Sequence, residues 1–212
     1  MHSASDLDSG RALLETGGGG WSSLDLVQVR GKSMPAADLE SLVALWRDAV
    51  SGSRTLVVVN DRLDVALATG AHGVHVGRDD LPVDEVRRLA PHGFVIGVSA
   101  HDEREVALAR ESEASYAGLG AFYGSRTKPE AVLLERDRPG LGEAIREAAI
   151  PILAIGGITA ERVHDVFSSA PVSGIAVSHA IQGAADPTAA TLELRAEVDR
   201  AWMARKPRAV QG

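Results

Sequence analysis

Cationic and amide side chains gather early in the chain, in the segment Gln28-Val29-Arg30-Gly31-Lys32. The segment completes an apolar run, Leu24–Val29, whose composition is typical of a β-strand. Because alternate residues of a strand share a face, Gln28, Arg30 and Lys32 could all point the same way. Two fixed cations and an amide suit a phosphate-rich ligand, although a solvated strand end would have the same composition.

Carboxylates follow the next two apolar runs. Asn60-Asp61 comes after Thr55–Val59, and Asp79-Asp80 comes shortly after Gly73–Val76. Each aspartate could simply cap a helix or close a turn. Two carboxylates on neighbouring strand ends, with cations opposite, also suit a Mg²⁺ (magnesium) ion that bridges to phosphate oxygens. The spacing alone does not decide between these interpretations.

Hydroxyl groups and glycines mark the later runs. Ser99 follows a run that starts at Phe94, and Ser178-His179 follows Gly174–Val177. The pair Gly156-Gly157 follows another run, and paired glycines let a phosphate approach backbone N–H groups. A packing reason for the two glycines is equally consistent. Three histidines near strand ends are interpreted as structural rather than catalytic: His72, His75 and His101.

The elements that must position these residues alternate along the chain. The strand-like runs are Leu24–Val29, Thr55–Val59, Gly73–Val76, Phe94–Val98, Ser115–Leu119, Pro151–Ile155 and Gly174–Val177. The helix-like stretches are Ala36–Val50, Asp61–Thr69, Val83–Leu89, Glu103–Glu113, Leu141–Ala148, Ala160–Phe167 and Pro187–Ala204. This alternation predicts an α/β fold with a parallel sheet and right-handed crossovers, a TIM-type (β/α)8 barrel. Chemistry in such barrels occurs at the carboxyl ends of the strands.

The start of the barrel is less regular than the rest. A closed barrel has eight strands, and no apolar strand precedes Leu24, so we expect the first strand to be degenerate or missing. An open doubly wound sheet is the alternative. The long charged loop Tyr123–Pro139 follows the fifth run, where such barrels keep active-site lids. We expect residues 1–212 to form one domain and residues 206–212 to be a disordered tail.

Composition restricts the class of protein. The 212 residues include no cysteine, which excludes disulfides and thiolate metal sites, and the formal net charge of -7 argues against nucleic-acid binding. No apolar run approaches the roughly 18 residues of a membrane span, and the N-terminus does not have the pattern of a secretory signal. We therefore expect a cytoplasmic protein whose partners are phosphorylated small molecules. The sequence leaves the oligomeric state open, with a homo-oligomer as one option.

Taken in order, these motifs resemble the thiamine phosphate synthase family. The resemblance covers roughly Leu24 to Ile181. It rests on Gln28-Val29-Arg30-Gly31-Lys32, Asn60-Asp61, Gly73-Val74-His75-Val76-Gly77 with Asp80, Gly97-Val98-Ser99-Ala100-His101, Thr127-Lys128 and Ala154-Ile155-Gly156-Gly157-Ile158. It implies a Mg²⁺-dependent transferase that joins hydroxymethylpyrimidine pyrophosphate to a thiazole phosphate and releases pyrophosphate.

The resemblance also implies a role for each matching residue. The contacts to the pyrimidine pyrophosphate would be Gln28, Arg30, Lys32, Asn60, Ser99 and Lys128. Of these, Arg30, Lys32, Ser99 and Lys128 would be catalytic, because they face the charge that grows on the leaving pyrophosphate. Asp61 and Asp80 would bind Mg²⁺. The thiazole-phosphate side would be formed by Thr127, Gly157, Ser178 and His179.

The sequence departs from the family pattern mainly on the thiazole side and in the long loop. The family usually has Gln at Arg78, Pro at Ala121 and Gly124, Thr at Ser125, and Ser at His179. Two alternatives therefore stay open. One is a thiazole tautomerase of the same superfamily, which typically has a functional histidine where Ala121 stands. The other is a non-catalytic barrel that binds phosphorylated ligands.

Overall fold

Seven parallel strands form one curled sheet in the order β1-β2-β3-β4-β5-β6-β7. The computed structural model describes residues 23–124 and 132–205. The segment in which we expected a degenerate or missing first strand and the predicted disordered tail both lie outside the described residues. The strands are β1 Leu26–Val29, β2 Leu56–Asn60, β3 Gly73–Val76, β4 Val95–Ala100, β5 Tyr116–Leu119, β6 Ile152–Ile155 and β7 Gly174–Ala176. Each strand lies within two residues of its predicted bounds, because most of the runs are rich in Val, Ile and Leu.

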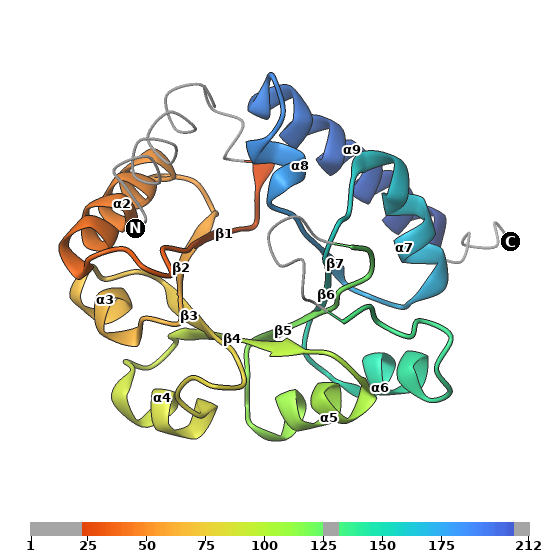
Figure 1. The fold of residues 1–212 in the computed structure, drawn as a ribbon, viewed down its shortest axis with the longest axis horizontal. Helices are drawn as coiled ribbons and strands as arrows, with labels where there is room; N and C mark the ends of the chain where they lie inside the picture. The colour runs from red at the N-terminus through yellow and green to blue at the C-terminus, as the bar shows by residue number, and fades with distance from the viewer. Residues whose placement is uncertain (1–22, 125–131, 206–212) are drawn as a thin grey trace, which may run out of the picture.

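The helices lie around the outside of the curled sheet (Figure 1). They are α2 Ala36–Ala49, α3 Leu63–Ala68, α4 Val83–Leu89, α5 Glu103–Glu111, α6 Leu141–Glu147, η2 Ala160–Arg162, α7 Val163–Ser169, α8 His179–Gln182 and α9 Pro187–Arg205. A doubly wound sheet would have helices on both faces, so that alternative is wrong and the TIM-type architecture is confirmed. The four-residue helix α8 was not predicted, since so short a segment has no periodicity.

The core lies between the sheet and its helices. Val27 and Val29 on β1, and Val57 and Val59 on β2, point outward and are buried in one continuous hydrophobic cluster. Helix α2 contributes side chains at the spacing of one helical face: Leu39, Leu42, Val43 and Trp46. Because successive side chains of a strand alternate, the remaining positions of each strand point inside the barrel. No helix in the described part of the chain is both long and apolar enough to cross a membrane.

Helix α9 links the two ends of the sheet. Its Arg195 side chain lies 3.3 Å from the carboxylate of Asp25 and donates to the carbonyl of Ser23 at 3.4 Å, just before β1. The Thr55 hydroxyl donates to the carbonyl of Leu24 at 2.8 Å, which ties the entry of β1 to β2. The ion pair is exposed and contributes little stability, so these contacts mainly fix where β1 begins.

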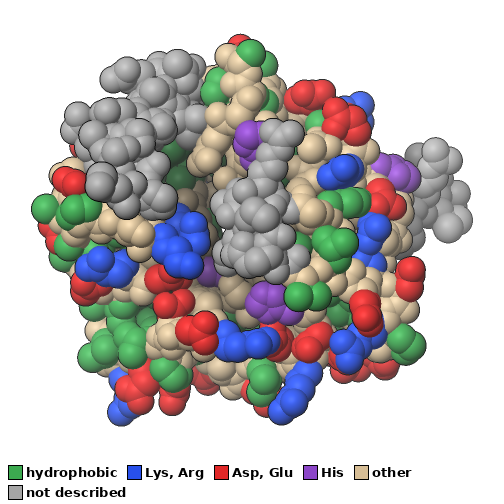
Figure 2. Space-filling model, in the orientation of Figure 1, with side chains coloured by type: hydrophobic (Ala, Val, Ile, Leu, Met, Phe, Trp, Pro, Cys, Tyr) green, Lys and Arg blue, Asp and Glu red, His purple; other side chains and the backbone are tan. Residues whose placement is uncertain are grey.

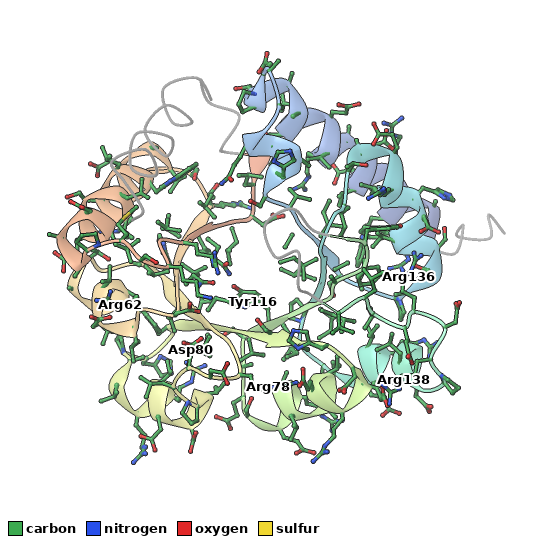
Figure 3. The ribbon with its side chains drawn as sticks, viewed as in Figure 1. Arg62, Arg78, Asp80, Tyr116, Arg136 and Arg138 are labelled. Atoms are coloured by element: carbon green, nitrogen blue, oxygen red, sulfur yellow. The ribbon has the colours of Figure 1, made fainter. Side chains whose placement is uncertain are left out.

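Paired residues of neighbouring strands face the same side of the sheet, and one such row crosses the barrel interior. It consists of Asn60, His75, Gly97 and Tyr116. A Cβ atom at Gly97 would lie 2.2 Å from Cζ of Tyr116. The glycine therefore leaves the space in which the phenol ring crosses β4 toward His75, and Figure 3 shows Tyr116 inside the ring of strands.

The close approach of β3 and β4 predicts a large effect for Gly73→Ala. The new Cβ would lie 2.1 Å from the carbonyl oxygen of Val95, so the backbone must shift. We expect the free energy of unfolding to fall by about 3 kcal/mol, the upper end of the usual range for overpacked interiors. Gly124→Ala is the matched control, because its Cβ meets nothing within 4 Å. Urea unfolding of both variants checks this, and equal stability would contradict it.

Burial of Tyr116 predicts a specific sensitivity to alkali. Burial raises the pKa of its phenol from 10.0 to about 12. Because the folded pKa lies above the unfolded one, the contribution to stability is fully present below pH 10 and is lost as the pH rises toward 12. We expect Tyr116→Phe to show a smaller loss of stability across this interval. Urea unfolding of both proteins along the pH series measures it, and identical slopes would contradict the assignment.

Candidate active site at the carboxyl ends of the strands

The parallel topology places the predicted site residues at one rim of the barrel, formed by the carboxyl ends of the strands. Residues from six described strands meet there: Gln28, Arg30 and Lys32 at β1, Asn60 and Asp61 at β2, Asp80 after β3, Ser99 on β4, Gly157 after β6, and Ser178 and His179 after β7. Thr127 and Lys128 were also predicted to lie there, and both are outside the described residues.

The β1 segment places Gln28 and Arg30 at the inside of the rim, whereas Lys32 lies in a turn beyond the end of the strand. Since Val27 and Val29 are buried against the helices, Gln28 and Arg30 face the interior. Arg30 and Lys32 are exposed, and neither forms an ion pair with any residue that the structure describes. Figure 2 shows Lys and Arg side chains beside the hollow near the middle of this face. The arrangement suits an anionic ligand.

Asp61 has an unusual backbone. Its φ of 63° lies in the left-handed region, and its N–H donates to the carbonyl of His75 at 2.8 Å. Helix α3 begins only at Leu63, with Arg62 as its N-cap residue and no capping bond from a side chain. Asp61 is therefore not the N-cap residue of α3. A non-glycine residue in this conformation costs about 1 kcal/mol or more, and such strain concentrates at functional sites.

Asp80 closes a turn. Its Oδ2 accepts a hydrogen bond from the N–H of Gly77 at 2.7 Å, so the turn interpretation of this aspartate is confirmed. It does not cap α4, whose N-cap residue is Pro82. The turn holds the carboxylate at the rim (Figure 3) and leaves its remaining lone pairs for other partners.

Four polar side chains connect across the barrel, and we refer to them as the interior network: Gln28, Tyr116, His75 and Ser99. Nδ1 of His75 lies 3.1 Å from the phenol oxygen of Tyr116, and Nε2 lies 3.1 Å from Oγ of Ser99. The Gln28 side chain forms a hydrogen bond with the same phenol. Tyr116 and His75 are only 7% and 9% exposed. The network therefore joins two predicted substrate contacts through two buried residues.

Sequence reasoning missed Tyr116 and interpreted His75 as structural. The other two histidines have local partners: Nδ1 of His72 accepts from the N–H of Val57 at 3.0 Å, and Nδ1 of His101 lies 2.8 Å from Glu105. A signal for Tyr116 was present, since it precedes Gly118 by two residues on β5 and so shares its inward face.

The pair Gly156-Gly157 has a packing reason. Both have positive φ, at 101° and 62°, and a Cβ at Gly157 would lie 2.3 Å from the carbonyl oxygen of Gly124. The N–H of Tyr123 donates to the carbonyl of Gly156 at 3.0 Å. Arg162 donates to the carbonyl of Gly157 at 2.6 Å, and its guanidinium lies 4.5 Å from the centre of the Tyr123 ring. The turn after β6 thus packs tightly on the loop after β5.

Tyr123 is fixed in turn by α7. Its hydroxyl donates to Asp165, whose carboxylate also accepts from Arg136 at 2.6 Å. The guanidinium of Arg136 lies 4.9 Å from the centre of the Tyr123 ring. Hydrogen bonds from Tyr123 and Arg136 hold the pKa of Asp165 below its usual value. The cluster anchors the first and last described parts of the long loop beside the Gly156-Gly157 turn.

The departures from the family pattern have local partners. Arg78 pairs with Glu105 of α5 outside the ring of strands (Figure 3). Ala121 is buried, and its N–H donates to the carbonyl of Val132 at 3.4 Å, a bond that proline could not form.

The ring of His179 lies against Gly183, one turn further along the chain. A Cβ at Gly124 would meet no atom of the described residues within 4 Å, and Ser125 lies outside those residues.

Comparisons with known proteins agree with this geometry. A family model described as thiamine monophosphate synthase matches residues 11–181. The thiamine-phosphate synthase of Methanoculleus marisnigri is 42% identical over 176 residues, which cover 81% of this chain and 80% of that protein. The thiamine-phosphate synthase of Coprothermobacter proteolyticus is 38% identical over 169 residues, with 80% and 79% covered.

A solved structure agrees as well. The thiamine phosphate pyrophosphorylase from Pyrococcus furiosus superposes with a TM-score of 0.77 at 32% identity, and the alignment covers 92% of this chain and 90% of that one. From the family match, the identities and the shared fold, we conclude that the chain belongs to the thiamine monophosphate synthase family.

Proposed function

We propose that this protein is a thiamine phosphate synthase that joins hydroxymethylpyrimidine pyrophosphate to a thiazole phosphate, releases pyrophosphate and depends on Mg²⁺. The observation that carries the proposal is the inner rim. There the cations Arg30 and Lys32, which have no ion-pair partner among the described residues, share a rim with the carboxylates of Asp61 and Asp80. We further propose that the enzyme acts in the cytoplasm, and a homo-oligomer remains one option for its assembly.

The reaction requires charge stabilisation and alignment more than proton transfer. The bond between the pyrimidine methylene and the pyrophosphate oxygen breaks, and electron donation from the pyrimidine amino group stabilises the resulting cation. The thiazole nitrogen then forms the new bond to that carbon. Arg30 and Lys32 neutralise the charge that grows on the leaving pyrophosphate, while Asn60 and Ser99 hold it by hydrogen bonds. Thr127 and Lys128 join this proposal on the family resemblance alone.

The thiazole phosphate is proposed to bind on the opposite side of the rim. Gly157 follows β6, and Ser178-His179 follows β7, so the two segments lie on neighbouring strands. In barrels of this type the last two loops commonly form a phosphate site. The exposed side chain of Ile155 also faces the interior here, where it provides apolar surface for a ring.

Two carboxylates suffice for the proposed metal. No group of three or more His, Asp or Glu side chains in residues 23–124 and 132–205 is placed to hold a metal ion. Mg²⁺ fits such a site, because it takes one or two protein carboxylates, here Asp61 and Asp80, and completes its shell with waters and phosphate oxygens. When bound, it would supply positive charge to the pyrophosphate.

The buried Ala121 disfavours the tautomerase alternative. A tautomerase typically has a functional histidine at this position, and the methyl group of alanine cannot transfer a proton. A non-catalytic barrel would keep the same ligands without turnover, so an assay rather than the rim geometry separates it from the synthase.

The direct test supplies both precursors. We expect the purified protein to form thiamine phosphate and pyrophosphate from hydroxymethylpyrimidine pyrophosphate, thiazole phosphate and Mg²⁺, and to lose turnover when a chelator removes the metal. Chromatographic detection of thiamine phosphate gives the readout. Binding of both precursors without product would instead identify a non-catalytic barrel.

Asp80→Asn tests the metal assignment. We expect turnover to fall about 100- to 1,000-fold, as for loss of one charge-stabilising group. Stability should change by less than about 1 kcal/mol, because the asparagine oxygen can still accept from the N–H of Gly77. Asp79→Asn is the matched control, with the same chemical change at the neighbouring exposed residue. Turnover is measured against Mg²⁺ concentration, and near-normal rates for Asp80→Asn would refute the assignment.

A further inference from the structure

The interior network admits two directions of hydrogen bonding. A neutral imidazole donates from one ring nitrogen and accepts at the other. In the first direction, Tyr116 donates to Nδ1 of His75, and the Nε2–H of His75 donates to Ser99. In the second, Nδ1–H donates to the phenol, and the Ser99 hydroxyl is used up as a donor to Nε2. Both are compatible with the 3.1 Å separations.

The Gln28 contact favours the first direction. Burial is the main influence on the Tyr116 phenol and raises its pKa, whereas the bond from Gln28 acts to lower it. A hydrogen bond lowers the pKa of a phenol when it donates to the oxygen and so favours the charged form. The Gln28 amide has N–H donors, so it can donate to the phenol oxygen. In that arrangement the phenol keeps its own proton for another acceptor, and Nδ1 of His75 is 3.1 Å away.

The ligand chemistry points the same way. Pyrophosphate has only acceptor oxygens, so a serine beside it must donate its hydroxyl proton. In the second direction the Ser99 hydroxyl donates its proton to His75, so only the lone pairs of the Ser99 oxygen face the anion. In the first direction His75 donates to Ser99, which leaves the Ser99 hydroxyl proton free. The carbonyl oxygen of Gln28 is likewise free to accept from an amino group.

We infer that Tyr116 and His75 are positioning residues: they fix the Nε2–H tautomer of His75, so that Ser99 donates to the pyrophosphate and the Gln28 carbonyl accepts from the pyrimidine amino group. This inference rests on the proposed function, since it takes Gln28 and Ser99 as substrate contacts. Gly97 supports the interior network, because the absence of a side chain at this position lets the Tyr116 phenol reach His75.

The tautomer is measured directly by ¹⁵N–¹H correlation NMR of the histidine rings in the unliganded protein. Among the signals of the seven histidines, that of His75 is the one that disappears in His75→Gln. We expect His75 to be the pure Nε2–H tautomer, and to become a mixture of tautomers in Tyr116→Phe. Tyr123→Phe is the matched control, because its phenol binds Asp165 instead, and the His75 signal should not change. An Nδ1–H tautomer or an imidazolium in the wild-type protein overturns the inference.

Kinetics test whether the tautomer matters to the substrate. We expect Tyr116→Phe to lower kcat/KM for the pyrimidine pyrophosphate roughly tenfold, as for loss of one hydrogen bond, with the KM of the thiazole phosphate unchanged. In a Ser99→Ala background the same substitution should have a smaller effect than in the wild-type background, because only the contact through Gln28 is then left to lose. Multiplicative losses in the double variant would indicate a merely structural role and overturn the inference.

Binding of inorganic pyrophosphate with Mg²⁺, followed by calorimetry, separates the two proposals. We expect Tyr116→Phe and Ser99→Ala to weaken it by similar factors. If both variants bind pyrophosphate more weakly but the wild-type protein has no synthase turnover, the proposed function is refuted and the positioning role of Tyr116 and His75 is supported. If turnover is normal but Tyr116→Phe leaves pyrophosphate binding unchanged, the positioning role is refuted and the proposed function is supported.

Discussion

Backbone pairing in parallel register, from β1 to β7, decides which side chains meet inside this barrel. The row of Asn60, His75, Gly97 and Tyr116 exists only because β2 to β5 pair residue against residue. A slip of one residue in any of them would turn its polar side chains toward the helices and its valines toward the ligand. The outward valines, buried in the core, hold the register, so the hydrophobic effect positions the polar site.

The sequence alone predicted the parts of the site that depend on local order. Strands ended where Val- and Ile-rich runs gave way to polar residues, and parallel pairing then brought Arg30, Asp61 and Ser99 to one rim. What it could not predict depends on distant contacts. Tyr116 and His75 are separated by 41 residues, and their hydrogen bond requires both the register and the space at Gly97. The left-handed backbone of Asp61 likewise accompanies a hydrogen bond from its N–H to His75 on β3, 14 residues further along the chain.

Two departures from the family pattern, Arg78 and Ala121, have partners outside the inner rim. Arg78 turns away to Glu105 on α5, and Ala121 uses its N–H inside the long loop. Neither contact involves the inner cations, the two carboxylates or the interior network. The exposed ion pair contributes little to stability, so the change at Arg78 is energetically small. At these two positions the sequence differs from the family around the candidate site, whereas His179 is a difference within the site itself.

The space that Gly97 leaves for Tyr116 has a consequence for how this sequence can evolve. Any side chain at position 97 would collide with the phenol, and loss of the phenol would leave an unfilled gap over the glycine. A change at either position alone should therefore lower the stability of the fold. Across homologous sequences we expect positions 97 and 116 to covary.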